Sequence, residues 1–264
     1  MSNPRLPAEI FDYMVDFLHD YPTALKKCCL VSKSWIPRTR SHLFVRVNFG
    51  SASGLRSWRK MFPDPSTSPA HYVKSLSINS SGTLRAAGAE GGGWIRSFSH
   101  VVDLAVTGQR TCDDRSALSL VPLHGLSPVV KSLRLNFIDF PSSQISDFIF
   151  SFPVLEDLTV YVCSEALLVN GNDPDWLATT LQPSTSPVFT GSLEIDLDEG
   201  MRLIGRRLLS LPGGLHFRKL TLEWIEEEDL LLAMALVDGC SHTLEYLSIT
   251  SNSGASIQRL CQHK

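Results

Sequence analysis

Three groups of residues in this sequence could carry chemistry, and each has a simpler structural explanation. The acidic run 226–229, Glu-Glu-Glu-Asp, could bind a metal ion or support acid–base catalysis. It opens the apolar run 230–237, so we interpret it as a helix N-terminus whose acids match the helix dipole. The glycine-rich segment 88–94 lacks the Gly-Lys-Ser/Thr of a phosphate-binding loop, so we expect a flexible loop there. The pair Arg206-Arg207 is isolated, which favours a solvated surface.

The residue combinations of common catalytic and metal sites are missing from the sequence. No Gly-x-Ser-x-Gly motif could hold a nucleophilic serine, and no His-Glu-x-x-His motif could hold zinc. His100, His124, His216 and His242 are dispersed along the chain. The 6 cysteines include no Cys-x-x-Cys pair and are too sparse for a disulfide scaffold, so we expect reduced thiols. We therefore predict no catalytic residue, no metal ligand and no cofactor.

The composition indicates a globular protein, with 43% hydrophobic and 19% charged residues. A net charge of -3 provides no overall attraction for nucleic acid or anionic lipid. The sequence shows no secretory signal pattern, and no uncharged apolar stretch reaches the roughly 18 residues that a membrane span needs. We expect an intracellular protein, cytoplasmic or nuclear, without a nucleic-acid or membrane partner.

Leucine content and charge divide the chain into two regions. Leucine occurs 8 times in residues 1–100 and 29 times in residues 101–264. Residues 1–49 carry 7 basic and 4 acidic side chains, whereas the rest of the chain carries 17 and 23. The Gly/Ser/Ala-rich residues 50–54 indicate a turn. We predict an N-terminal unit over residues 1–49, a connector helix and proline-rich crossing over 50–72, and a leucine-rich body over 73–264.

The N-terminal unit has the pattern of three short helices. Pro7 suits a first helical turn, and a second helix is expected to start near Pro22. Ser32 is a plausible cap for a third helix, which Pro37 should kink or restart. In the first helix an apolar stripe recurs at helical spacing: Ile10, Met14, Phe17 and Leu18. Three helices in about 45 residues bury a marginal core, so the unit should pack against a neighbour or partner.

The N-terminal unit resembles the F-box motif. The matching segments occur in the family's order over about residues 5–47: Leu6-Pro7-Ala8-Glu9-Ile10, Leu18, Leu30-Val31-Ser32-Lys33-Ser34-Trp35 and His42-Leu43-Phe44. The chain is similar to the large fungal F-box family, and this resemblance implies docking on the Skp-family adaptor of SCF (Skp–cullin–F-box) ubiquitin ligases. The residues that match the family's fold-building or adaptor-facing positions are Leu6, Pro7, Ile10, Leu18, Val31 and Trp35. For Leu18 and Trp35, a role in the core alone is equally consistent with the motif.

The leucine-rich body repeats one strand-like pattern, apolar-x-x-Leu-x-apolar. Its seven copies start at Val73, Val101, Val130, Leu155, Thr190, Phe217 and Leu244, and the fifth has a polar residue in its first position. Most copies are 25–29 residues apart, with apparent helices between them at 144–152 and 226–237. This pattern resembles a leucine-rich-repeat solenoid, in which parallel strands stack side by side. The predicted fold class is therefore α + α/β, a three-helix F-box followed by an irregular solenoid with a parallel sheet.

Two observations leave the fold of the body open. The family's Asn or Cys beyond each strand is present only as Cys163 and Asn252, so the solenoid would be irregular. An open, doubly wound α/β sheet would also give alternating strands and helices. At the C-terminal end, Ile257, Leu260 and Cys261 have helical spacing and predict a thin cap. The strand 244–249 would then be an exposed sheet edge.

Alternation along the strands predicts an outward, uncovered face of the sheet. Its larger polar and aromatic members are candidates for binding a target protein: Asn79, Arg134, Asn136, Tyr161, Glu194, Lys219, Glu223 and Tyr246. A merely solvated face is the alternative. Together with the F-box resemblance, this face suggests a non-catalytic, substrate-recruiting subunit of a ubiquitin ligase. A repeat scaffold without ubiquitination is the second possibility, and a hydrolase on an α/β sheet is a distant third.

Overall fold

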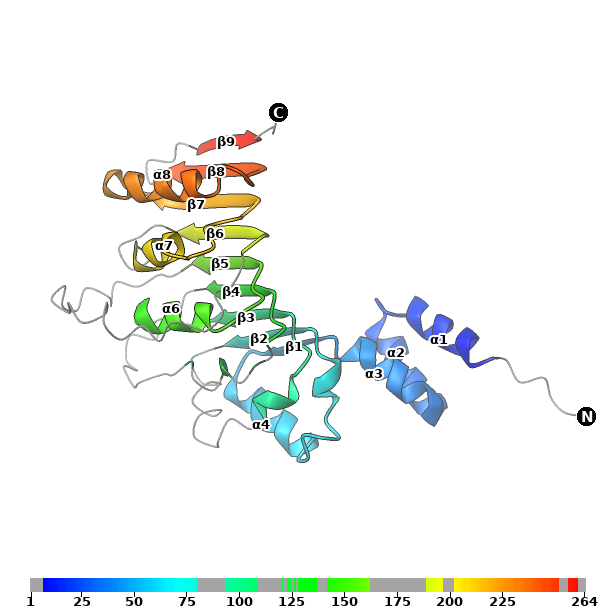
Figure 1. The fold of residues 1–264 in the computed structure, drawn as a ribbon. Coiled ribbons are helices and arrows are strands. Elements are labelled where there is room, and N and C mark those ends of the chain that lie inside the picture. Colours follow the sequence, from blue (N-terminus) through cyan, green and yellow to red (C-terminus); the bar gives the residue numbers. More distant parts are fainter. Residues whose placement is uncertain are drawn as a thin grey trace, which may run out of the picture.

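The computed structural model describes residues 7–79, 94–108, 120, 123–124, 126, 128–136, 142–161, 189–196, 202–251 and 256–260. Within them the chain forms a small helical unit at the N-terminal end and a larger sheet flanked by helices (Figure 1). Of the residues discussed above, Leu6, Cys163, Asn252, Cys261 and the glycine-rich residues 88–93 lie outside the described part.

Three α-helices and one short 3₁₀ turn form the N-terminal unit, as the sequence predicts. They are α1 (Ala8–Phe17), α2 (Pro22–Val31), η1 (Lys33–Trp35) and α3 (Ile36–Leu43). Ser32 caps the 3₁₀ turn, because its Oγ accepts a hydrogen bond from the amide of Ser34 at 3.3 Å. Pro37 lies in the first turn of α3, where its missing N–H leaves no helical bond unmade. The chain therefore restarts a helix at this proline.

The core of the N-terminal unit is small. Its buried side chains are Val15, Leu25, Cys28 and Thr39. The rings of Phe11 and Trp35 pack with centroids 5.4 Å apart and join α1 to the 3₁₀ turn. The unit contacts the rest of the protein where α3 meets the short helix η2 (Pro69–Tyr72).

In the described part of the chain, nine strands form one sheet whose spatial order follows the sequence. They are β1 (Arg46–Phe49), β2 (Ser75–Asn79), β3 (Asp103–Thr107), β4 (Ser132–Asn136), β5 (Asp157–Tyr161), β6 (Ser192–Asp196), β7 (Lys219–Ile225), β8 (Tyr246–Ser251) and β9 (Ser256–Leu260). The first eight are parallel, and β9 is antiparallel to β8. A doubly wound sheet reverses its strand order at a switch point, and this sheet does not. The doubly wound alternative is therefore wrong.

Both ends of the sheet differ from the prediction. Residues 46–49, which we assigned to the N-terminal unit, form β1 and pair with β2. At the other end, residues 256–260 form strand β9 and not the predicted cap helix. The backbone groups on the free side of β8 can form hydrogen bonds with the whole segment 256–260. A helix of barely one turn would form few hydrogen bonds of its own and is unstable, so the strand is favoured. Consequently β8 is not the sheet edge that we predicted.

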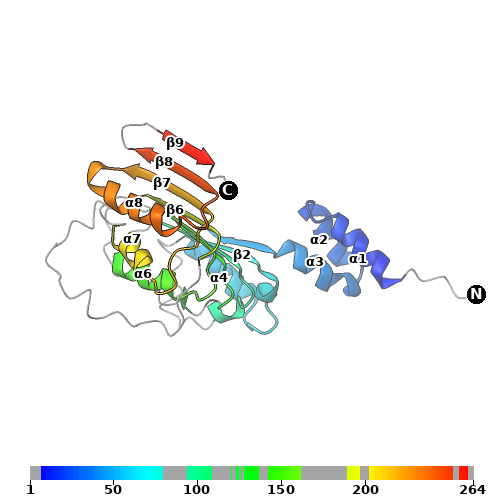
Figure 2. The same ribbon diagram turned by 45° about the horizontal axis from the view of Figure 1, so that its top comes forward.

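Helices cover one face of the sheet and leave the other open (Figures 1 and 2). The covering helices are α4 (Ala52–Met61), α6 (Ser142–Phe150), α7 (Arg202–Leu209) and α8 (Leu230–Gly239). The strands present two buried rows to them. One row is Leu76, Leu104, Leu133, Leu158, Leu193 and Leu220, and the other is Ile78, Val106, Leu135, Val160, Ile195 and Leu222. Burial of one such side chain contributes about 1.5–3 kcal/mol, so these rows dominate the stability of the sheet.

A backbone pattern repeats where each strand begins. A carbonyl oxygen just before or at the start of one strand accepts hydrogen bonds from two successive amides that lead into the next strand. The accepting residues are Val45, Lys74, Val102, Lys131, Gly191 and Arg218. This two-amide contact fixes the register between neighbouring strands with main-chain atoms alone. The repeat therefore does not depend on the Asn or Cys positions that the sequence mostly lacks.

The junction between β5 and β6 departs from this pattern and explains the polar fifth repeat. Phe189, one residue before Thr190, is fully buried and its ring lies 5.1 Å from that of Phe217. The first apolar position of this repeat is therefore Phe189, one residue earlier than the pattern places it. Gly191 lies between this position and the start of β6 at Ser192. Here the amide of Ser192 donates to Oδ1 of Asp157 at 2.7 Å instead of to a carbonyl.

We predict that Gly191→Ala destabilises the protein by about 1–3 kcal/mol, the usual cost of inserting atoms into a packed site. A Cβ at this position would lie 2.3 Å from Asp157 Oδ1 and 3.0 Å from the carbonyl oxygen of Glu156. Gly54→Ala is the control, because its Cβ would meet nothing closer than Ser51 Oγ at 3.8 Å. Urea unfolding of both variants measures the difference, and equal midpoints would contradict the close approach.

Candidate functional site

Helix α1 has two apolar faces, and the structure covers only one of them. The inner face consists of buried Val15 and of Phe11 and Leu18, which are half-buried. The outer face has the same helical spacing, i, i+3, i+4 and i+7, and is exposed: Ile10 by 46%, Tyr13 by 70%, Met14 by 49% and Phe17 by 73%. Solvated helices do not need a second apolar face, so this one is suited to contact another protein.

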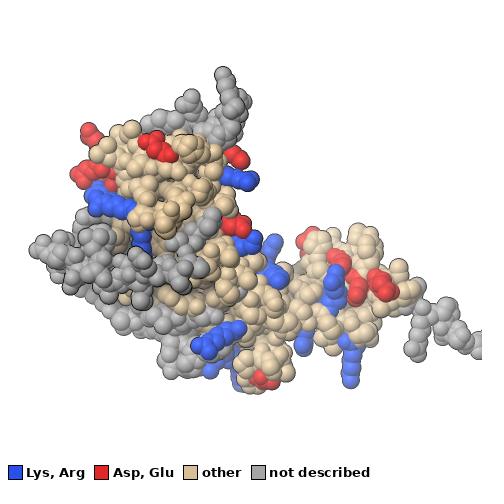
Figure 3. All heavy atoms as spheres, viewed as in Figure 1, with Lys and Arg blue, Asp and Glu red and all other residues tan. Residues whose placement is uncertain are grey.

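The end of α2 adds further exposed apolar side chains to the same unit. Leu30 is 88% and Val31 68% exposed, and Tyr21 is 62% exposed at the start of the helix. In the space-filling view, broad uncharged areas separate the charged atoms of this unit (Figure 3). The unit therefore exposes more large apolar side chains than its small core contains.

The structure divides the predicted adaptor-facing residues into two groups. Pro7, Ile10 and Val31 are exposed and available for contact. Leu18 is half-buried, and Trp35 packs against Phe11, so both contribute to the fold of the unit. Sequence reasoning missed the exposure of the remaining apolar side chains: Tyr13, Met14, Phe17, Tyr21 and Leu30. The available signal was the doubled apolar pattern of α1.

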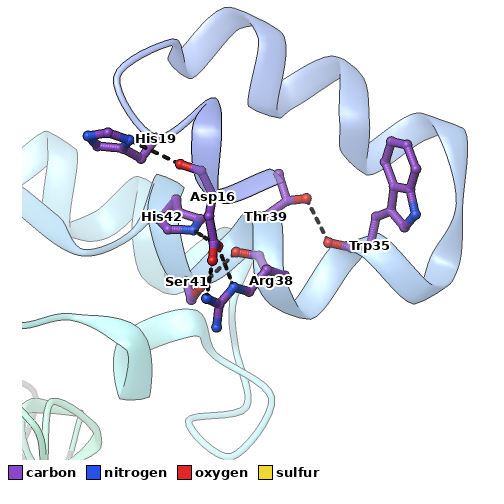
Figure 4. A network of polar contacts seen from close by, with 7 residues as sticks. All are labelled: Asp16, His19, Trp35, Arg38, Thr39, Ser41 and His42. Atoms are coloured by element: carbon purple, nitrogen blue, oxygen red, sulfur yellow. Dashed lines mark hydrogen bonds and ion pairs between the residues drawn. The ribbon is translucent and has the colours of Figure 1, made fainter. Parts of the chain in front are cut away.

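A polar network ties α1 to α3 (Figure 4). The carboxylate of Asp16 accepts hydrogen bonds from Arg38 Nε and Nη2, both at 2.5 Å, and its Oδ1 lies 2.7 Å from His42 Nε2. The hydrogen bonds from Arg38, followed by that from His42, hold the pKa of Asp16 far below its ordinary value. The charge of Arg38 is therefore satisfied within the N-terminal unit.

This network predicts a specific dependence of stability on pH. The pKa of Asp16 is depressed in the folded state, so its contribution is complete above the unfolded value of about 4. It is lost as the pH falls from there toward the folded value. The side chains of Asp16 and Arg38 are 36% and 46% exposed, which limits the contribution to about 1 kcal/mol or less.

Asp16→Asn should therefore be less stable than the wild type at pH 7, and this difference should narrow below about pH 4. Urea unfolding between pH 7 and pH 3 measures it. A difference that stays constant over this range would show that the Asp16 charge does not contribute.

The open face of the sheet carries the residues proposed to bind a target. Arg134 and Lys219 are exposed there, and the other six are half-buried: Asn79, Asn136, Tyr161, Glu194, Glu223 and Tyr246. The alternation of buried and outward residues predicted for the strands is confirmed, with two exceptions. In β7, the outward residue Thr221 is only 8% exposed. In β8 the pattern is weaker, because Leu247 and Ile249 are only partly buried and the outward residue Ser248 is only 7% exposed.

Two contacts on the open face join candidate residues of neighbouring strands between β5 and β8. The hydroxyl of Tyr161 donates to Glu194 on the next strand. Burial raises the pKa of Tyr161 above its ordinary value, and the hydrogen bond to Glu194 and the charges of Glu223 and Asp196 raise it further. Lys219 Nζ lies 5.4 Å from the centre of the Tyr246 ring, within cation–π range. The eight candidates are therefore not a single cluster, because Asn79 lies on β2, at the other end of the sheet.

The acidic run 226–229 has a structural role that sequence reasoning identified only in part. It precedes α8 as predicted, but Asp229 is 1% exposed and its Oδ1 accepts a hydrogen bond from Arg202 Nε at 2.5 Å. The expectation for Arg207 is also wrong. Its Nη1 donates to Asp147 at 2.6 Å and to Ser146 at 2.8 Å, and its guanidinium lies over the ring of Phe150. These contacts join α7 to its neighbours α8 and α6.

The described residues include no group of three or more His, Cys, Asp or Glu side chains placed to hold a metal ion. Over the same residues, no helix is both long and apolar enough to cross a bilayer. What the geometry offers is two surfaces for contact: the apolar outer face of the N-terminal unit and the open face of the sheet. No family model, no curated protein and no solved structure matches this chain.

Proposed function

We propose that this chain is the substrate-recruiting F-box subunit of an SCF-type ubiquitin ligase. The observation that carries the proposal is the exposed outer face of α1, formed by Ile10, Tyr13, Met14 and Phe17. Such a face on a unit with a small core is expected to be covered by a partner. The order of the F-box-like segments in the sequence supports a Skp-family adaptor as that partner, which would link the chain to a cullin.

We further propose that the body is an irregular leucine-rich-repeat solenoid. Three features support this assignment: strands stacked in chain order, helices on one face, and a main-chain contact repeated between neighbouring strands. A stacked array of this kind presents a long open face, and such faces commonly bind proteins. The candidate target-binding residues on β2 to β8 lie on this face.

The proposed mechanism is proximity and requires no catalytic residue in this chain. The N-terminal unit would hold the ligase adaptor while the open face of the sheet holds a target. Linking the two binding sites in one molecule raises the effective concentration of the target at the ligase. Ubiquitin transfer would be carried out by the other subunits of the assembly.

Co-purification with a Skp-family adaptor tests the proposal. We expect a stable equimolar complex by size-exclusion chromatography of the purified proteins. Its absence would overturn the F-box assignment. A second step adds cullin, the ubiquitin-transfer components and a partner trapped on the sheet. Ubiquitination of that partner is expected, whereas an intact complex without it would favour the scaffold role.

A further inference from the structure

A cavity of about 500 Å³ lies beside α4, away from both contact surfaces described above. Its lining comes from α4, from the proline-rich crossing that follows it, and from the short helix η3 (Ile95–Ser97) with the residue before it. The lining residues include Arg56, Trp58, Lys60, Phe62 and Trp94. A volume of this size is typical of a small-molecule site and exceeds what an inorganic ion needs.

The charge of the cavity is one-sided. Arg56, Arg59 and Lys60 have the helical spacing i, i+3 and i+4, so they project from one side of α4, and none of the described residues that line the cavity is acidic. Figure 3 shows basic side chains gathered over this helix. Within the described part of the chain, neither Arg56 nor Lys60 forms an ion pair. Two cations without counterions beside a cavity favour a ligand with two negative charges.

Aromatic rings from α4, from the residue that follows it and from the residue before η3 form another wall of the cavity. Trp58 and Trp94 are 8% and 9% exposed, and both pack against Phe98 with ring centroids 5.7 Å away. Phe62 lies 5.0 Å from Trp58. This packing fixes the rings in place before any ligand binds, so little ordering free energy is lost on binding.

We propose that this cavity binds a phosphate monoester carried on an aromatic group. Arg56 and Lys60 would pair with the phosphate dianion, and Trp58 and Phe62 would contact the aromatic part. Phosphate supplies the required double charge, and a planar ring matches the aromatic walls. The site neither uses the adaptor surface nor depends on the proposed ligase function.

Isothermal titration calorimetry of the full chain with phenyl phosphate tests the proposal, with inorganic phosphate and phenol as partial ligands. We expect saturable binding of phenyl phosphate at about 1 mM or below, and at least tenfold weaker binding of either part alone. An O-phosphotyrosine peptide and adenosine 5′-monophosphate then distinguish a modified protein from a nucleotide as the source of the group. Failure of phenyl phosphate to saturate, or equal binding of either partial ligand, would overturn the proposal.

Two variants locate the site. Arg56→Ala/Lys60→Ala should weaken binding at least tenfold, and Lys26→Ala/Lys27→Ala, which removes two exposed charges from α2, should leave it within twofold. Unchanged binding in the first variant, or an equal loss in the second, would show that ligands bind elsewhere.

Discussion

Replacing Ile10 and Phe17 by lysine is expected to abolish binding of the Skp-family adaptor. Both side chains lie on the exposed outer face of α1, so the substitutions remove no contact from the core of the unit. Burial of a large apolar side chain contributes about 1.5–3 kcal/mol, and an ammonium group in the same interface adds a desolvation cost. The affinity of the double variant should therefore fall by more than about 100-fold, measured by titration with the purified adaptor.

The body provides a matched control for this experiment. Leu231 and Met234 on α8 are 80% and 54% exposed, and their replacement by lysine should leave adaptor affinity unchanged. Thermal unfolding should show both double variants folded. If the Ile10→Lys/Phe17→Lys protein binds the adaptor as tightly as the wild type, the outer face of α1 is not the docking surface.

Arg202→Met is expected to cost about 3–5 kcal/mol of the free energy of unfolding. Asp229 is 1% exposed, and the guanidinium of Arg202 gives its Oδ1 and Oδ2 hydrogen bonds at 2.5 and 3.3 Å. Removing the arginine leaves a buried carboxylate without its partner, which is far more costly than losing a surface ion pair. Urea unfolding at pH 7 measures the change.

Arg206→Met is the control, because Arg206 lies on the same helix but is exposed, and the expected change is within about 0.5 kcal/mol. An Arg202→Met/Asp229→Leu double variant should regain most of the lost stability, since it also removes the carboxylate that the single variant leaves buried without its partner. Equal unfolding midpoints for Arg202→Met and Arg206→Met would refute the importance of the buried pair.

The sequence predicted the parts of this fold that depend on local periodicity. Alternation around Leu76, Leu133 and Leu193 identified strands and their buried face, because one side chain in two must enter the core. The apolar stripe of α1 predicted the helix but not its two faces, because Ile10, Met14 and Phe17 are exposed whereas Leu18 is half-buried. Such periodic patterns are local, so they can be recognised without knowing which other segments pack against the strand or helix.

Features that depend on a distant partner could not be predicted in this way. Arg202 and Asp229 are 27 positions apart in the sequence, and Asp16 and Arg38 are 22 positions apart. No local pattern connects residues at such separations, so neither ion pair could be predicted. Strand β9 forms because β8 offers it a template, although its own spacing suggests a helix. The cavity beside α4 is lined by residues from three segments of the chain. No local sequence pattern shows that these segments lie close together in the fold.

The chain-order stacking of β1 to β8 has a consequence for how the protein is made. From β2 to β8 each strand pairs with the one that precedes it in the chain, and the two-amide contact joins them through main-chain atoms at every junction except that between β5 and β6. A strand leaving the ribosome therefore finds its template already synthesised and does not wait for any later segment. Such neighbour-only pairing keeps loop closure short and limits the time that apolar strands remain exposed. Folding can thus advance from β1 onward in step with translation.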